Sequence, residues 1–309
     1  MSGLKTFSLL IVLSVLVVVG GGLAGLSTGN PLAGLIPALG FAFVMNFFAF
    51  WFSDKAALKM AGAKEVSEAD EPRLHYMVSE VARMAELPKP RVFLIENDSP
   101  NAFATGRNPK KAVVAVTTGL RRILSEAELR GVIAHEMAHV KNRDMLIMTI
   151  VAVLAATIAF MAWMAQWTLI FGGMSGRGRG GGGGGGGYGA IIGIVGMLAL
   201  IILMPLAASM VRFAISRTRE YTADETGARI IRDPLSLASA LEKLSNAVRI
   251  KAMPATKANE AMAHMYIVNP LGARSQHTNE TGGRFVGLFS SHPPMEERVE
   301  RLRKLVLYS

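Results

Sequence analysis

The sequence of 309 residues contains no cysteine and comparatively few charged residues. Without cysteine, the chain has neither disulfide bonds nor thiolate metal ligands, which is compatible with a reducing compartment. Charged residues make up 18% of the chain, against about 25% in an average soluble domain. Hydrophobic residues make up 51%. This shortage of charge indicates that part of the chain lies in a lipid bilayer.

Charge is missing chiefly from four long apolar runs. Each run exceeds the roughly 18–20 residues that a helix needs to cross a hydrocarbon core of ~30 Å. The runs cover residues 6–26, 31–53, 145–173 and 188–211. We expect four membrane-spanning helices, arranged as two hairpins. A cleaved signal peptide is disfavoured for the first run, because no A-x-A site follows it and the second run begins almost at once.

Basic residues flank the four runs unevenly. On one side lie Lys5, Lys55, Lys59, Lys64, Lys141, Arg143, Arg212, Arg217 and Arg219. The opposite side carries only Arg177 and Arg179. The positive-inside rule therefore predicts that both termini and both polar segments are cytoplasmic. The net charge of +10 fits attraction to anionic headgroups, and no nucleic-acid-binding motif accompanies it.

The apolar runs divide the chain into four parts. We expect an N-terminal transmembrane hairpin over 1–53 and a first cytoplasmic part over 54–144. A second hairpin over 145–211 contains a glycine-rich loop at 172–189, whose composition is that of a flexible connector. A second cytoplasmic part follows over 212–309. The predicted fold is mostly α-helical, with an α+β cytoplasmic domain that contains a small β-sheet.

The first cytoplasmic part alternates between helical and extended patterns. A polar linker at 55–69 precedes a helix over 72–87, with apolar residues on one face. Strands are predicted at 91–96 and 112–119, and the segment between them is a loop dense in turn-forming residues. Ser125 and Glu128 form a capping-box pattern that starts a helix near residue 126. No glycine or proline interrupts residues 132–171, so this helix is expected to continue into the third apolar run.

The second cytoplasmic part is also predicted to be helical. One helix continues from the fourth apolar run to about residue 231, and Asp233-Pro234 starts another that ends near residue 249. Residues 251–289 lack clear periodicity and read as a loop. His292-Pro293-Pro294 starts a last helix that ends near residue 306.

A possible metal site lies in the segment H-E-M-A-H, formed by residues 135–139. Residues four apart share one face of a helix, so the imidazoles of His135 and His139 can reach one zinc ion. Glu136 is placed to take a proton from a water bound to that ion. The alternative is a chance match of polar residues on a helix.

A catalytic zinc usually has a third protein ligand, and Glu220 is the candidate. Asp224 lies one turn later on the same face and can accept a hydrogen bond from the outer nitrogen of a ligand histidine. A solvated, charged helix leaving the membrane is the alternative. Position favours the metal site. The chain enters the membrane shortly after His139, and the hairpin over 145–211 returns it to the same membrane face shortly before Glu220. By the rise of a helix, the two residues lie roughly 9–13 Å from the hydrocarbon.

Several segments together resemble the HtpX family of membrane zinc metalloproteases, which is related to Ste24-type peptidases among the gluzincins. The matching segments are PNAFATG, HEMAHVKNRD, SREYTADETGA and SSHPPMEERVERL, set among four apolar runs. The resemblance covers essentially the whole chain. It implies a zincin-like protease domain, one Zn²⁺ per chain and a third ligand that is a glutamate.

The resemblance also implies a function and a location. The chain is expected to cleave damaged or misassembled membrane proteins in the bacterial inner membrane, as a multi-pass protein with its active site in the cytoplasm. Polypeptides, the lipid bilayer and other membrane quality-control proteases are the implied partners, and nucleic acid is not. Glu136 is expected to act as general base, and His292 and Arg298 are candidate catalytic residues in the C-terminal His-Pro motif.

The segment Asn101, Ala102 and Phe103 resembles the substrate-side edge of the family. An exposed strand edge can bind an extended peptide through backbone hydrogen bonds, although an ordinary turn before a strand is the alternative. Two other functions compete with proteolysis. A membrane scaffold or holdase with a structural metal site would not need Glu136, and a transporter would carry ionisable residues within its spans, where these runs have essentially none.

Overall fold

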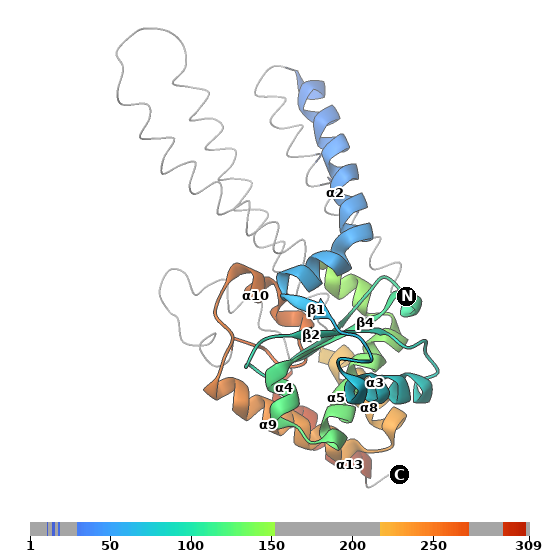
Figure 1. Ribbon diagram of the computed structural model, residues 1–309. Helices are drawn as coiled ribbons and strands as arrows, with labels where there is room; N and C mark the ends of the chain where they lie inside the picture. The colour runs from blue at the N-terminus through green and yellow to red at the C-terminus, as the bar shows by residue number, and fades with distance from the viewer. Residues whose placement is uncertain are drawn as a thin grey trace, which may run out of the picture.

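The computed structural model describes residues 11, 14, 15, 18, 30–151, 217–271 and 293–306. These residues form helices packed around a four-stranded sheet, from which one long helix projects (Figure 1). Several expectations lie outside the described residues: the span over 188–211, nearly all of that over 6–26, most of that over 145–173, the loop at 172–189, and His292.

The projecting helix is α2, Pro31–Met60, which contains the whole second apolar run. Asn30 caps its start by accepting a hydrogen bond from Leu32 N at 3.2 Å. Large apolar side chains are exposed along it, among them Leu32, Ile36, Leu39, Phe41, Phe43, Val44, Phe47, Phe48, Phe50, Trp51 and Phe52. Within the described ranges no unbroken helix passes a length-and-apolarity test for membrane crossing, whereas the pair Gly34–Phe48 and Phe50–Met60, bent by 62°, passes it together.

A polar contact connects the first and second apolar runs. Asn46 Nδ2 on α2 donates a hydrogen bond to Ser14 Oγ at 2.6 Å. Ser14 belongs to the first run and Asn46 to the second. Hydrogen bonds between polar side chains link helices whose other surfaces are apolar. The contact joins the two runs at these two residues, and the N-terminal hairpin stays a prediction.

The sheet combines parallel and antiparallel neighbours. Its strands are β1 (Ala63–Glu65), β2 (Arg91–Ile95), β3 (Ala102–Thr105) and β4 (Val113–Thr117). Their spatial order is β1-β2-β4-β3. The central pair β2 and β4 is parallel, whereas β1 pairs antiparallel with β2 and β3 pairs antiparallel with β4. Strand β3 is therefore an edge strand of this sheet.

Side chains alternate along each strand, and those of β2, β3 and β4 are largely buried on both faces of the sheet. Val92 and Val114 enter a core shared with the main helices. Phe93, Phe103 and Ala115 enter a second core on the opposite face. The near-continuous apolar sequences of β2 and β4 are the sequence counterpart of this two-sided burial.

Two groups of helices supply these cores (Figure 1). The first core contains residues of α3 (Pro72–Met84), α5 (Glu126–Asn142), α8 (Arg217–Ile231), α9 (Pro234–Ile250) and α13 (Met295–Leu305). The second contains residues from the end of α2, from α10 (Lys257–Met262) and from η2 (Ala263–Met265). Two further short helices are η1 (Pro109–Lys111) and α4 (Thr118–Ile123). The α+β class predicted for the two polar segments is confirmed.

Two short strands depart from the sequence prediction. The predicted linker at 55–69 contains the end of α2 and strand β1, and the predicted loop before residue 112 contains β3. Both strands are short, and turn formers surround β3. Their extended conformation depends on pairing with β2 and β4, respectively, which a local pattern does not reveal.

The expectation of one continuous helix from residue 126 into the third apolar run is wrong. Helix α5 ends at Asn142, because Arg143 adopts a left-handed conformation with φ of 60°. Arg143 N and Asp144 N then donate to the carbonyls of Val140 and His139 at 3.2 and 3.0 Å, which closes the helix end. A new helical segment begins at Met145. The break places Asp144 beside the H-E-M-A-H segment.

Candidate metal centre

The helix that carries the H-E-M-A-H segment begins at the predicted capping box. Ser125 Oγ accepts a hydrogen bond from Glu128 N at 3.3 Å, and Glu128 Oε2 accepts one from Ser125 N at 2.8 Å. Helix α5 then passes through the core, and the whole H-E-M-A-H segment is buried. The capping box fixes where the helix starts, and the helical period then places both histidines on one face.

His135 and His139 turn their inner nitrogens toward each other, with 3.2 Å between the two Nε2 atoms. Glu220 completes the group from helix α8. Its carboxylate oxygens lie 3.7 Å from His135 Nε2 and 3.6 Å from His139 Nε2. The structure thus brings together the three residues that the sequence suggests as metal ligands.

This group fits a zinc ion. All three side chains are buried, and their ligand atoms lie within 4.8 Å of one another. Tetrahedral zinc with bonds of ~2.1 Å separates its ligand atoms by about 3.4 Å. The two imidazole nitrogens lie 3.2 Å apart, and one oxygen of Glu220 lies 3.6 Å from His139 Nε2 and the other 3.7 Å from His135 Nε2, all close to that value. Two imidazoles and one carboxylate also leave a fourth position open, as a catalytic zinc requires.

Glycine at position 227 allows α8 to lie close against α5. A Cβ atom added to Gly227 would lie 2.8 Å from His135 N and 3.0 Å from His135 Cα. Any larger residue would therefore push the two helix backbones apart. Since Glu220 and Asp224 reach His135 from α8, this close approach determines whether the carboxylates and imidazoles meet.

Each histidine also has a carboxylate near its outer nitrogen. Asp224 Oδ1 lies 2.9 Å from His135 Nδ1, and Asp144 Oδ2 lies 3.6 Å from His139 Nδ1. A carboxylate in this position holds a ligand imidazole in one tautomer and orientation. Arg219 approaches Asp144 in turn, with 3.2 Å between Nε and Oδ1. The break after α5 is what brings Asp144 to this place.

Arg298 on α13 is fully buried and contacts the carboxylates of the site. Its Nε and Nη2 atoms donate to both oxygens of Asp224 at 2.8 and 2.7 Å. Its Nη1 atom donates to Ile267 O at 2.9 Å and lies 3.7 Å from Glu220 Oε2. The paired geometry on Asp224 is the strong, bidentate arrangement that arginine forms with carboxylates.

The buried charges shift one another's pKa values. Burial favours the neutral form of Asp224, yet Arg298 and His135 hold the pKa of this carboxyl well below its usual range. Burial lowers the pKa of His135. At His139 burial acts in the same direction, but Asp144 and the nearby glutamates outweigh it and raise the pKa. The site therefore keeps Asp224 ionised behind a neutral His135.

Glu136 is also buried, and as the next residue after His135 it points to a different side of α5 from the histidine pair. Burial raises its pKa to about 7, and the nearby Glu220 acts in the same direction. His139 and the backbone amide of Ala104 on β3 partly oppose the increase. The contact with Ala104 shows that the edge strand of the sheet passes beside this glutamate.

The predicted substrate-side residues lie on that edge strand or just before it. Asn101, Ala102 and Phe103 are all fully buried. The edge is therefore not exposed at Ala102, because another part of the chain lies against it there: Ile267 N donates to Ala102 O at 3.1 Å. Phe103 points into the second core, away from the metal centre. His292, the remaining predicted site residue, lies outside the described residues.

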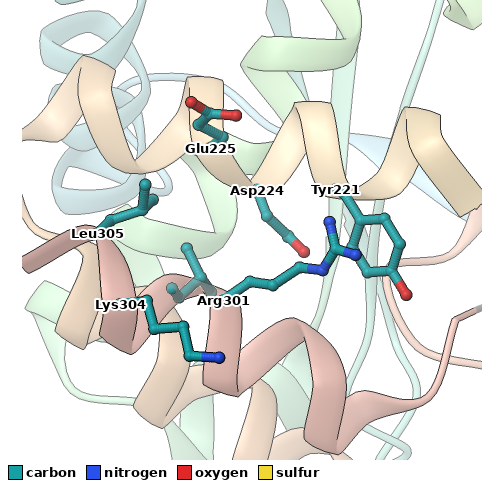
Figure 2. A pocket seen from close by; sticks show the side chains of 7 residues that line it. Tyr221, Asp224, Glu225, Arg301, Lys304 and Leu305 are labelled. Carbon is teal, nitrogen blue, oxygen red and sulfur yellow. The ribbon is translucent and has the colours of Figure 1, made fainter.

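A pocket of about 230 Å³ lies between α8 and α13, behind Asp224 (Figure 2). The guanidinium of Arg301 stacks on the ring of Tyr221, with its central carbon 3.8 Å from the ring centroid. Tyr221 thus packs toward α13, and it does not join the group formed by His135, His139 and Glu220.

Sequence reasoning did not identify two contributors to this site. Gly227 follows the third ligand by two helical turns, and a glycine inside a helix is a signal of close packing that could have been used. Ile267 lies in a segment without periodicity, and its role depends on contacts with residues far away in the sequence. No local pattern marks it.

Comparison with known proteins identifies relatives along almost the entire chain. A profile of Peptidase family M48 matches residues 68–306. A protein named Protease HtpX homolog from Persephonella marina is 50% identical over 306 residues, covering 99% of this chain and 98% of the relative. The protein of the same name from Thermodesulfovibrio yellowstonii is 51% identical over 305 residues, covering 99% of each chain. That from Pyrococcus furiosus is 47% identical and covers 89% of this chain and 87% of the relative.

Among solved structures, the crystal structure of S. mikatae Ste24p matches with a TM-score of 0.45 and 20% sequence identity. The match covers 85% of this chain and 57% of the other. A likeness at this level carries no structural argument.

Proposed function

This chain belongs to peptidase family M48 and is a membrane zinc metalloprotease, and from that premise we propose that His135, His139 and Glu220 are its zinc ligands. Glu136 is the general base of the reaction. The observation that carries this proposal is the meeting of two α5 imidazoles and one α8 carboxylate within 4.8 Å in the core. Glu136 follows the first of these ligands directly in the sequence.

Zinc held by these residues would polarise the scissile carbonyl and make water more acidic. Glu136 accepts a proton from the attacking water and passes it to the departing amine nitrogen. Asp224 keeps the outer nitrogen of His135 protonated, so that the inner nitrogen is free to bind the metal. Arg298 fixes Asp224 through both of its oxygens.

The peptide carbonyl needs hydrogen-bond donors while negative charge develops on its oxygen. We assign this role to Arg298 and His292. Support for Arg298 comes from its Nη1 atom, which already donates to a peptide carbonyl 2.9 Å away and lies 3.7 Å from the proposed ligand Glu220. Support for His292 is its place in the His-Pro motif just before α13.

The substrate lies along the edge of β3 as an extended strand. Asn101 and Ala102 offer side-chain and backbone groups that bind a peptide independently of its sequence. Phe103 packs in the second core and so holds β3 in place. Such backbone recognition suits a protease that degrades many damaged proteins. The inactive scaffold considered from the sequence has no support, since Glu136 is intact beside the proposed ligands.

The enzyme sits in the bacterial inner membrane as a multi-pass protein, with the metal centre and both termini in the cytoplasm. The exposed apolar side chains of α2 support the membrane location, because so large an apolar surface is rarely left in water. The asymmetry of lysine and arginine supports the orientation. Its substrates are damaged or misassembled membrane proteins, handled together with other quality-control proteases.

The deciding experiment is degradation of a destabilised model membrane protein by the purified enzyme in detergent. Wild type with zinc should cleave it, and a chelator should stop cleavage reversibly. Glu136→Gln should bind zinc normally and lose about 10²–10⁴-fold in rate. Cleavage by a metal-loaded Glu136→Gln enzyme at the wild-type rate would refute the assignment of the general base. Arg121→Gln, on helix α4 and paired with Glu71 rather than with any proposed site residue, is the control.

A further inference from the structure

A segment of the chain, Tyr266–Val268, lies along the outer edge of β3. Ile267 N donates to Ala102 O at 3.1 Å. Asn101 Nδ2 donates to Val268 O at 2.7 Å, and Val268 N donates to Asn101 Oδ1 at 3.3 Å. Because Ile267 faces Ala102 and Val268 faces Asn101, the segment runs antiparallel to β3.

The same segment reaches the metal centre through one guanidinium. Arg298 Nη1 donates to the carbonyl of Ile267 at 2.9 Å, and this nitrogen lies 3.7 Å from Glu220 Oε2. The Ile267 carbonyl is therefore a peptide group bound beside a proposed zinc ligand.

The side chains of the segment are buried as well. Tyr266 is 2% exposed, and its ring meets the edge of the Phe103 ring with centroids 5.3 Å apart and planes at 86°. Ile267 is 1% exposed and enters the core on the opposite face of the sheet. Tyr266 thus packs on one face of the sheet, whereas Ile267 and Val268 pack on the other, so the segment closes over the end of β3 and contributes to both cores.

These contacts are those that an extended peptide substrate needs. A peptide added to a sheet edge uses main-chain hydrogen bonds for affinity and alternate side chains for fit. Here the carbonyl of Ala102, both polar atoms of Asn101 and one donor of Arg298 are engaged by the chain itself. A substrate cannot use the same groups while the segment is in place.

We propose that Tyr266–Val268 is an internal competitor that occupies the peptide-binding edge of β3 and must leave before a substrate binds. This inference rests on the proposed function, which places the substrate on that edge. The apparent affinity for a substrate is then reduced by the fraction of molecules in which the segment has left. Loosening the segment activates the enzyme, and fixing it inhibits.

A reversible crosslink tests this competition. The chain has no cysteine, so Phe103→Cys combined with Tyr266→Cys introduces one defined pair at facing positions. Oxidation should lock the segment on β3 and reduce both substrate cleavage and binding of an unstructured, fluorescein-labelled peptide by about tenfold or more. Reduction with a phosphine should restore both in the same sample. Wild type treated identically controls for effects of the reductant on zinc.

The outcomes separate this proposal from the proposed function. If the locked and reduced forms cleave and bind equally, the segment is a fixed part of the fold, and the proposal is overturned while proteolysis stands. If neither form cleaves but only the reduced form binds the labelled peptide in fluorescence anisotropy, the competition stands and the proposed function fails.

A second pair of variants tests the same contact without a crosslink. In a Glu136→Gln background, Ile267→Pro removes the N–H that donates to Ala102 O, whereas Ile267→Ala trims the side chain and keeps that N–H. Loss of one neutral hydrogen bond should make Ile267→Pro bind the labelled peptide about fivefold more tightly than Ile267→Ala. Equal binding by the two variants would overturn the proposal.

Discussion

Helix α5 carries two buried glutamates in opposite surroundings, Glu128 at its capping end and Glu136 at its metal end. Glu128 accepts hydrogen bonds from Ser239 Oγ at 2.6 Å and Lys243 Nζ at 2.8 Å, besides the bond from Ser125 N. Burial alone would raise its pKa, but these partners lower it to about 2. Glu136 lies among imidazoles and another carboxylate, and burial raises its pKa to about 7.

The difference shows that one end of α5 stabilises the fold while the other end carries the proposed catalytic groups. At the capping end, a cation, a hydroxyl group and a backbone N–H fix the charge of Glu128, so this side chain joins α5 to α9. At the metal end, acidic and basic side chains form one buried cluster and shift one another's pKa values, as is common at functional sites. Variants at the metal end should therefore change zinc binding and rate, and variants at the capping end should change stability.

Removing the third ligand gives the largest expected effect on zinc. Glu220→Ala should weaken zinc binding more than about 100-fold, beyond the range expected for a supporting residue. Metal content after dialysis, measured by elemental analysis, is the readout. Glu225→Ala, on the exposed side of the same helix, is the control. Full zinc content in Glu220→Ala would mean that this carboxylate is not a ligand.

The supporting carboxylate should have a smaller effect. Asp224→Asn should weaken zinc binding about 10–100-fold, because the outer nitrogen of His135 loses its charged acceptor. Competition with a chromophoric chelator measures this change. Asp144→Asn should have less effect, since Asp144 lies 3.6 Å from its histidine and Asp224 lies 2.9 Å away. Equal losses in the two variants would contradict this ranking.

Two glycine variants distinguish the effect of α5–α8 spacing on zinc binding from the general destabilisation caused by crowding in the core. Gly227→Ala places a methyl group against His135, and Gly131→Ala places one 3.0 Å from the Leu237 backbone. Each should destabilise the fold by about 1–3 kcal/mol. Only Gly227→Ala should also weaken zinc binding, because it separates α8 from α5. Thermal unfolding with and without zinc tests this, and a similar zinc dependence in both variants would refute it.

The smallest effect is expected at the capping end. Glu128→Gln should lower the free energy of unfolding by about 1–3 kcal/mol and leave the cleavage rate per folded molecule unchanged. The folded-state pKa of Glu128 is about 2, below the ordinary value of 4.5. Its ionised form therefore contributes stability above about pH 4.5, and this contribution is lost as the pH falls toward 2.

Thermal unfolding of wild type and Glu128→Gln across this pH range measures that contribution. The difference between their midpoints should be largest near neutral pH and should shrink in acid. A constant difference would show that the ionised carboxylate does not stabilise the fold.

Prediction from the sequence succeeded where local physics was sufficient. The capping box placed the start of α5 at Ser125, and the four-residue spacing placed His135 and His139 on one face. The apolar pattern of β2 and the valine-rich pattern of β4 were recognised because central strands carry their own hydrophobic pattern. Strand β3 was missed, since its residues are extended mainly by pairing with β4.

The helix break after Asn142 shows a second limit. Nothing in the composition of residues 132–171 interrupts a helix, yet Arg143 takes a left-handed conformation there. Asp144 then reaches His139, and Arg219 reaches Asp144. The conformation of this turn is accompanied by long-range ion pairs that only the folded chain forms.

By itself, the sequence determined which residues can bind a metal and which helix carries two of them, because both properties follow from side-chain chemistry and the helical period. The tertiary structure decided that Arg298 clamps Asp224 and that Tyr266–Val268 covers β3. These contacts join positions 74 and more than 160 residues apart. Such pairings depend on the packing of the whole core. Many distant residues offer the same chemical groups, and only the folded structure determines which of them come into contact.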